Sequence, residues 1–174
     1  MKYLAFGLIA AFFVLGAMVP ESRAQGDAFI WVRTGQEGQH PGYRRVEGGK
    51  LNDGTPLVVC RSNVNQFLVP GKYYNRACLT PWHGKEIING QEIDIFMTKV
   101  PYTWRAIHNL SRSQIESGAV VAGSGSGQGT EYICRRQMQD GLHPGKYSIG
   151  NGICYISWGG KEYNFTDAFD LLFR

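Results

Sequence analysis

The sequence predicts an all-β fold built from two tandem antiparallel repeats. One ordered set of motifs occurs twice, about 74 residues apart, and short aromatic and β-branched segments lie between glycine-rich turns. Beyond the N-terminus, no segment carries apolar residues at helical spacing over three turns. Each copy alone is too small for a secure core, so we expect the copies to pack with pseudo-two-fold symmetry and to exchange strands.

The chain opens with a segment typical of a secretory signal peptide. A cationic start precedes a long apolar run, and small residues at Ser22 and Ala24 suit cleavage after Ala24. We assign residues 1–24 to this signal and expect a secreted, extracellular protein with no membrane span after cleavage. The alternative is an uncleaved membrane anchor. In a secretory compartment the sequons at Asn109 and Asn164 could be glycosylated, although such three-residue patterns also occur by coincidence.

Composition and motifs argue against several classes of function. The formal net charge of +4 is mild, and no run of lysine or arginine exceeds two residues, so the sequence offers no footprint for nucleic acid. The four histidines lie in unrelated contexts, and the chain has no CxxC pair, nucleophile elbow or phosphate loop. We expect a protein that is not an enzyme and that holds no metal or cofactor.

The first repeat is expected over residues 29–98. Its apolar segments are short and rich in β-branched and aromatic residues, which is typical of strands. The glycines cluster between these segments, as tight turns require. In chain order its motifs are Trp31, the glycine-rich turn at 48–55, Cys60-Arg61, Pro70-Gly71-Lys72-Tyr73, Cys78, Trp82-His83-Gly84-Lys85-Glu86 and the apolar segment 93–97.

The second repeat is expected over residues 102–174 and keeps the same order. Two residues are inserted between its Pro-Gly-Lys-Tyr motif and its second cysteine. The best helix candidate of the chain, residues 111–117, lies here and is short and polar. The motifs are Trp104, the glycine-rich turn at 123–130, Cys134-Arg135, Pro144-Gly145-Lys146-Tyr147, Cys154, Trp158-Gly159-Gly160-Lys161-Glu162 and the apolar segment 169–173.

The four cysteines form two equivalent pairs. Three pairings are possible in principle, and the repeat favours Cys60–Cys78 with Cys134–Cys154, because each copy then carries the same bond. Such bonds suit an oxidising compartment. The alternative is buried free thiols on neighbouring strands.

The ordered motifs resemble the DM-nine repeat family, whose tandem copies also occur in natterin-like proteins. The match rests mainly on Pro-Gly-Lys and Gly-Lys-Glu, which recur in both copies. The resemblance implies an all-β tandem fold and a role in binding rather than catalysis. Some members of the family are mannose-recognising lectins, and several are linked to innate immunity.

The resemblance implies carbohydrate ligands at Asp53 and Lys72 in the first repeat. A carboxylate accepts and an ammonium donates hydrogen bonds, which suits vicinal sugar hydroxyls, and we expect both groups to open onto one solvent-filled notch. Lys146 is the equivalent lysine of the second repeat, where the turn has no carboxylate. The alternative is that Asp53 only shapes its turn and that Lys72 is a solvated lysine.

Other recurring residues favour structural roles. Trp82 and Trp158 could stack on a sugar ring, but their recurrence favours packing. Glu86 and Glu162 also recur, and we expect each to fix a turn by accepting backbone N–H bonds. The alternative is ion pairing between the copies.

The resulting functional hypothesis is a secreted lectin for mannose-type glycans on microbial or host surfaces, acting as a pattern-recognition factor. Weak single sites would gain strength in a homodimer or larger oligomer. The main alternative is a structural or protein-interaction module without a sugar ligand. An auxiliary role in a membrane-acting system ranks last.

Overall fold

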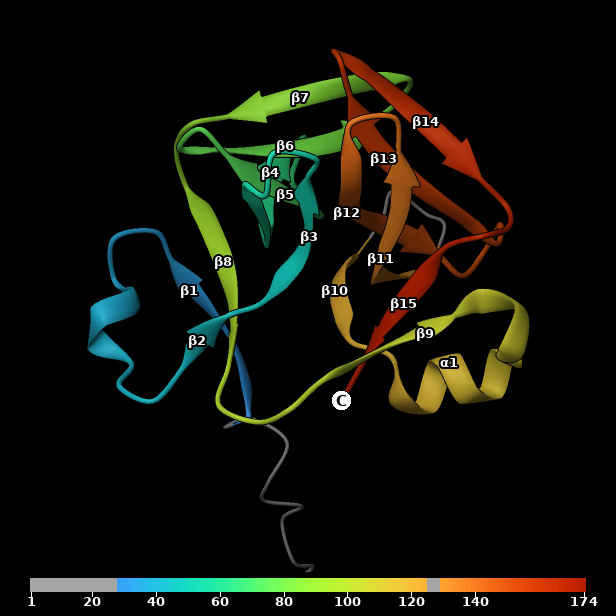
Figure 1. The fold of residues 1–174 in the computed structure, drawn as a ribbon, viewed down its shortest axis with the longest axis horizontal. Helices are drawn as coiled ribbons and strands as arrows, with labels where there is room; N and C mark the ends of the chain where they lie inside the picture. Colours follow the sequence, from blue (N-terminus) through green and yellow to red (C-terminus); the bar gives the residue numbers. More distant parts are fainter. Residues whose placement is uncertain (1–27, 125–128) are drawn as a thin grey trace, which may run out of the picture.

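The computed structural model describes residues 28–124 and 129–174 (Figure 1). The expected signal peptide at residues 1–24 and residues 125–128 of the second glycine-rich turn lie outside the described residues. Within the described ranges, 15 strands form one hydrogen-bonded antiparallel sheet, which confirms the all-β prediction. None of the described helices is long and apolar enough to cross a bilayer.

The elements fall into two successive sets. The first set is β1 (Phe29–Arg33), the 3-10 helix η1 (Glu37–Gln39), β2 (Arg44–Arg45), β3 (Glu47–Leu51), β4 (Pro56–Val64), β5 (Phe67–Tyr74), β6 (Ala77–Trp82), β7 (Lys85–Asn89) and β8 (Ile93–Thr98). The second set is β9 (Thr103–Ala106), the 3-10 helix η2 (Ile107–Asn109), α1 (Arg112–Gly118), β10 (Val121–Ser124), β11 (Thr130–Met138), β12 (Gly141–Ser148), β13 (Ile153–Trp158), β14 (Lys161–Phe165) and β15 (Asp170–Phe173).

The order of strands in the sheet is symmetric about the contact between β7 and β14. It runs β1-β8-β4-β5-β6-β7-β14-β13-β12-β11-β15-β9, so each strand of the first set on this path has an equivalent at the same distance from the centre. The short strands β2, β3 and β10 pair beside this path. Figure 1 shows the two halves side by side, with β7 and β14 meeting above them. This is the predicted pseudo-two-fold arrangement of two repeats with like topology.

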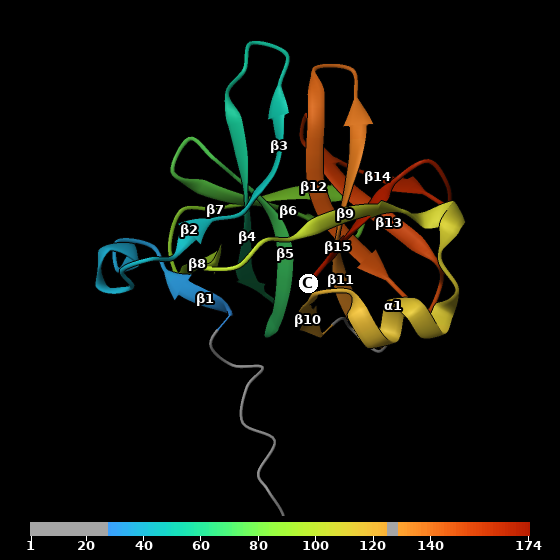
Figure 2. The ribbon, with the colours of Figure 1, turned by 60° about the horizontal axis from the view of Figure 1, so that its bottom comes forward.

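The exchange of strands takes the form of hairpins that reach across the centre. β3 pairs with β4 of its own half and also with β12, in the register Leu51 to Gly141. The backbone N–H of Asn52 donates to the carbonyl of Asp140 at 2.8 Å, which joins the β3–β4 turn to the β11–β12 turn. Figure 2 shows these two hairpins projecting side by side. A Cβ at Gly49 would overlap the carbonyl oxygen of Leu142, so glycine permits this approach.

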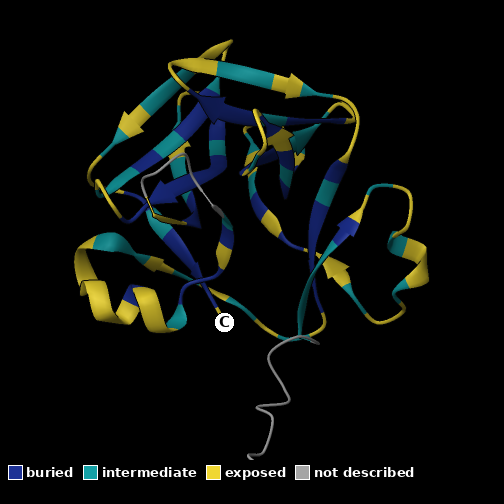
Figure 3. Cartoon of the chain, turned by 180° about the vertical axis from the view of Figure 1, so that it is seen from behind, coloured by how far each residue is buried: buried dark blue, intermediate teal, exposed yellow. Residues whose placement is uncertain are grey.

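A disulfide stabilises each repeat, and a shared core joins the two halves. Cys60 bonds to Cys78 and Cys134 to Cys154, as predicted, so the alternative of free thiols is wrong. Each disulfide lies in the core of its own repeat. A third cluster draws on both repeats, and Figure 3 shows such buried strands surrounded by exposed turns. Its buried members are Val46, Val59, Phe96, Val120, Ala122, Ile133 and Leu172.

The recurring Cys-Arg motif has a structural explanation. The guanidinium of Arg61 lies 4.4 Å from the centre of the Trp31 ring, and its Nε donates to Asp94 at 3.1 Å. A cation–π contact thus ties β4 to β1, and an ion pair ties it to β8, the strand between them. The second repeat has the same arrangement in Trp104, Arg135 and Asp170.

The one α-helix of the described chain packs against the core of the second repeat and lies below it in Figure 1. The Ser111 side chain caps α1 by accepting the backbone N–H of Gln114. The Gln114 side chain accepts the backbone N–H of Ser111, which completes a capping box. Only Ile115 of this helix is buried. The helix coincides with the short polar candidate in the sequence.

Candidate functional site

The Gly-Lys-Glu motifs meet where the two repeats join. Glu86 accepts a hydrogen bond from the backbone N–H of Gly160 at 2.9 Å, and Glu162 accepts one from Gly84 at 3.2 Å. The backbone repeats the exchange, since the N–H of each glutamate donates to the carbonyl of the same glycine. The turn-fixing role predicted for both glutamates is confirmed, and each glutamate fixes the turn of the opposite repeat.

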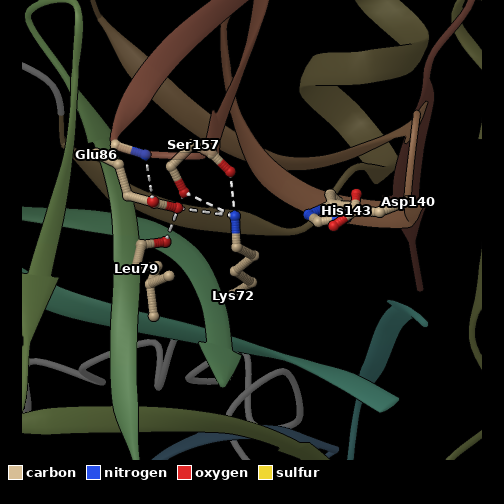
Figure 4. A network of polar contacts seen from close by, with 7 residues as sticks. Lys72, Leu79, Glu86, Asp140, His143 and Ser157 are labelled. Atoms are coloured by element: carbon tan, nitrogen blue, oxygen red, sulfur yellow. Dashed lines mark hydrogen bonds and ion pairs between the residues drawn. The ribbon is translucent and has the colours of Figure 1, made fainter. Parts of the chain in front are cut away.

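Lys72 lies beneath this junction and is only 4% exposed. Its Nζ donates to Glu86 Oε1 at 3.0 Å and to the carbonyl oxygen of Ser157, with Ser157 Oγ 3.4 Å away (Figure 4). Gly71 allows β5 to come this close to β6, because a Cβ there would overlap the carbonyl oxygen of Leu79. Burial lowers the pKa of the Lys72 ammonium, and the attraction of Glu86 opposes that change.

A second polar pair reaches the same place from the other repeat. His143 Nε2 lies 2.9 Å from Asp140 Oδ1, with the imidazole buried and the aspartate side chain 47% exposed (Figure 4). Burial and the nearby ammonium of Lys72 lower the pKa of His143, so its imidazole is mainly neutral at pH 7. The pKa of the Asp140 carboxyl lies below its ordinary value. Burial alone would raise it, but a hydrogen bond from the side chain of Trp158 and the proximity of His143 together lower it by more. The Asp140 carboxylate is therefore ionised and partly open to solvent.

These groups surround a cavity of about 210 Å³, which we call the Lys72 pocket. Both repeats contribute to its lining, and Asp140, His143, Trp158 and Gly159 come from the second. The lining residues are Leu51, Leu57, Lys72, Tyr74, Leu79, Glu86, Asp140, His143, Trp158 and Gly159.

The symmetry-related position holds a smaller cavity of about 70 Å³, which we call the Lys146 pocket. Lys146 Nζ lies 3.8 Å from Glu131 Oε1 and sits over the rings of Trp82 and Tyr155, at 4.9 and 5.1 Å from their centres. Here the first repeat supplies Trp82 and His83, and the other lining residues come from the second repeat. The lining residues are Trp82, His83, Glu131, Lys146, Ser148, Tyr155 and Glu162.

The two pockets share one frame of a lysine, a glutamate and a tryptophan, and they differ in other side chains that line them. Each has a Pro-Gly-Lys lysine, a Gly-Lys-Glu glutamate and the tryptophan of the opposite repeat. The recurring tryptophans therefore join the repeats and also line the cavities. At aligned positions, Leu57 in the first repeat corresponds to Glu131 in the second, and Leu79 corresponds to Tyr155.

The structure does not bring Asp53 and Lys72 together. Asp53 is fully exposed on the β3–β4 turn and does not line the Lys72 pocket. Its Oδ1 accepts the backbone N–H of Thr55 at 2.8 Å, and this bond lowers its pKa. Asp53 thus shapes its own turn, which was the alternative to a role in sugar binding. The expected notch open to solvent is wrong, and so is the solvated Lys72, because this lysine is buried and its ammonium bonds to Glu86 and Ser157.

Asp140 is the carboxylate that sequence reasoning missed. It stands in an Asp-Gly pair at residues 140–141, on the β11–β12 turn, and lines the pocket that holds Lys72. That second Asp-Gly pair was the available signal. The aligned position in the first repeat is Gln66, so the repeat alone did not single it out. Of the remaining candidates, Lys146 is buried in its own pocket, and Asn109 and Asn164 are exposed.

Comparisons with known proteins agree with the fold. A family model described as DM9 repeat matches residues 52–165. Among solved structures, the crystal structure of the nematode sperm cell motility protein MFP2B matches with a TM-score of 0.58 and 18% sequence identity. The match covers 74% of this chain and 40% of that one, so this chain spans less than half of MFP2B, and the likeness is one of fold alone. No curated protein matches the chain significantly.

Proposed function

The chain belongs to the DM9 repeat family, and from this premise we propose that it is a secreted carbohydrate-binding module for mannose-type glycans. Family and all-β fold together support a β-rich binding module. The observation that supports a sugar ligand is the Lys72 pocket, which combines an ionised, half-exposed carboxylate with an indole and apolar side chains. Its volume of about 210 Å³ is below the roughly 300–1,000 Å³ of drug-sized pockets and suits one monosaccharide.

Each side chain has a distinct part in this proposal. Asp140 accepts hydrogen bonds from sugar hydroxyls, and such charge-assisted bonds are stronger than neutral ones. Trp158 and Leu79 offer apolar surface to the C–H face of the ring. Lys72 already has acceptors around its ammonium, so it holds the pocket in shape and polarises it instead of reaching for the ligand.

The setting of the protein follows the same proposal. Two disulfides suit an oxidising, extracellular compartment. One small open site binds weakly, because sugar hydroxyls exchange water bonds for protein bonds with little net gain. A homodimer or larger oligomer would raise the avidity for microbial or host glycans, as pattern recognition requires.

The test is mannose binding by calorimetry, with Asp140→Asn compared with Asp53→Asn. Asp140→Asn loses a charge-assisted bond of about 1.5–3 kcal/mol, so its affinity for mannose should fall by about tenfold or more. Asp53→Asn, at an exposed position, should bind mannose like wild type. Equal weakening in Asp53→Asn would move the ligand to the β3–β4 turn. A glycan array without any bound glycan removes the function, and capture of a defined protein partner that free mannose does not displace would favour an interaction module.

A further inference from the structure

We propose that the Lys146 pocket is a second binding site and that it takes the primary ammonium group of a small organic ligand, such as a 2-amino sugar. The inference is independent of mannose binding in the Lys72 pocket. It rests on buried carboxylate oxygens that no described residue pairs.

Glu131 is the central observation. It is 3% exposed and lines the Lys146 pocket, and its Oε2 has no hydrogen-bond partner among the described residues. Glu162 lines the same cavity, and its buried Oε2 is likewise unpaired in the described chain, while its Oε1 accepts the N–H of Gly84. Buried acceptors left without a donor are costly, so two in one cavity indicate a donor that comes from outside.

The balance of charges in the Lys146 pocket also favours a cationic ligand. The described lining residues place two carboxylates against the single ammonium of Lys146, which lies 3.8 Å from Glu131. Burial raises the pKa of Glu131, Lys146 opposes this, and the nearby Glu162 raises it further. A second ammonium would neutralise the excess negative charge and donate to both free oxygens.

The shape of the pocket favours an ammonium head group. A volume of about 70 Å³ holds a small head group and leaves the rest of a ligand outside the partly open mouth. Trp82 and Tyr155 already face one cation, Lys146, and aromatic walls of this kind suit organic ammonium groups. Two carboxylates supply far fewer oxygens than the six to eight that calcium takes.

Comparison with the first repeat isolates the decisive position. Leu57 occupies the place of Glu131 in the Lys72 pocket, within the same frame of lysine, glutamate and tryptophan. The frame therefore tolerates an apolar side chain there. Burying a glutamate costs more free energy than burying a leucine at the same position, and binding of a cationic ligand would offset that cost.

The experiment compares glucosamine with glucose, which differ only in an ammonium or a hydroxyl at carbon 2, by ligand-observed NMR and calorimetry on the whole mature protein. Methylammonium forms a third arm and separates a site for amino sugars from one for amines in general. We expect glucose to bind at least tenfold more weakly than glucosamine. Methylammonium that binds as well as glucosamine assigns the site to the ammonium alone, and weaker binding assigns it to the amino sugar.

Two variants connect the binding to the pocket. Glu131→Gln keeps the shape and removes the charge, and Glu131→Leu introduces the residue that the first repeat has at this position, so the second variant serves if the first does not fold. Both are expected to lose at least tenfold in affinity for glucosamine, while Glu116→Gln on the exposed face of α1 changes nothing. The proposal is overturned if glucosamine does not bind, if glucose binds equally well, or if the folded Glu131 variants bind like wild type. Retained mannose binding in Glu131→Gln keeps this outcome separate from the proposed function.

Discussion

At the scale of single residues, the burial of Lys72 indicates a structural role. Its buried ammonium pairs with Glu86 and bonds across the repeats to Ser157. Lys72→Met keeps a long unbranched side chain but leaves the Glu86 carboxylate without the ammonium that pairs with it. Because breaking a buried ion pair costs about 3–5 kcal/mol, we expect a loss of that order in the free energy of unfolding, measured in urea.

Two further variants test the reason for this loss. Lys85→Met, at an exposed position of β7, should stay within about 0.5 kcal/mol of wild type. Adding Glu86→Gln to Lys72→Met should recover part of the loss, since no unpaired charge then remains buried. An additive or larger loss in the double variant would show that packing, and not the charge, determines the cost.

Glu131 makes stability depend on pH. Burial raises its pKa above the ordinary 4.5, so the folded protein holds this proton more tightly than the unfolded chain. The contribution of Glu131 to stability therefore falls as pH rises from 4.5 through the raised pKa. Glu131→Gln should gain stability relative to wild type between about pH 4 and about pH 7, as measured by denaturation at both values. A difference between the two proteins that is the same at both pH values would contradict the shift.

At the scale of elements, the glycine of Pro-Gly-Lys sets how closely two strands approach. A Cβ at Gly71 would overlap the carbonyl of Leu79, and one at Gly145 would overlap that of Tyr155. Gly71→Ala and Gly145→Ala should each cost about 1–3 kcal/mol in unfolding free energy, the usual cost of overpacking. Gly90→Ala, which would meet open space, is the matched control. If all three variants unfold alike, close approach is not what the motif provides.

The sequence predicted elements better than their contacts. The cysteine pairing and the equivalence of Lys72 and Lys146 could be read from the repeat, because aligned residues occupy aligned strands. The pairing of β3 with β12 could not, since it depends on backbone hydrogen bonds across the centre. Asp140 reaches the Lys72 pocket only through that crossing, which is why Asp53 was the more obvious candidate.

At the scale of the whole molecule, both candidate pockets depend on the junction. Trp158 of the second repeat lines the Lys72 pocket, and Trp82 of the first lines the Lys146 pocket. A repeat taken alone would have the lysine and the glutamate of its pocket but not the tryptophan. Duplication therefore did more than add a second copy, because each half completes the site of the other.

This dependence predicts that neither repeat folds alone. Val59 and Phe96 from one half pack with Ile133 and Leu172 from the other in the shared core, and separation would expose them. Fragments 25–101 and 102–174, produced separately, should show no cooperative urea transition by circular dichroism, and an equimolar mixture should regain one. Intact chain cleaved at a protease site introduced at Val100 is the control, and it should stay folded as a two-fragment complex. A single fragment that unfolds cooperatively would mean that each repeat has a sufficient core of its own, and that the junction serves the pockets and not the fold.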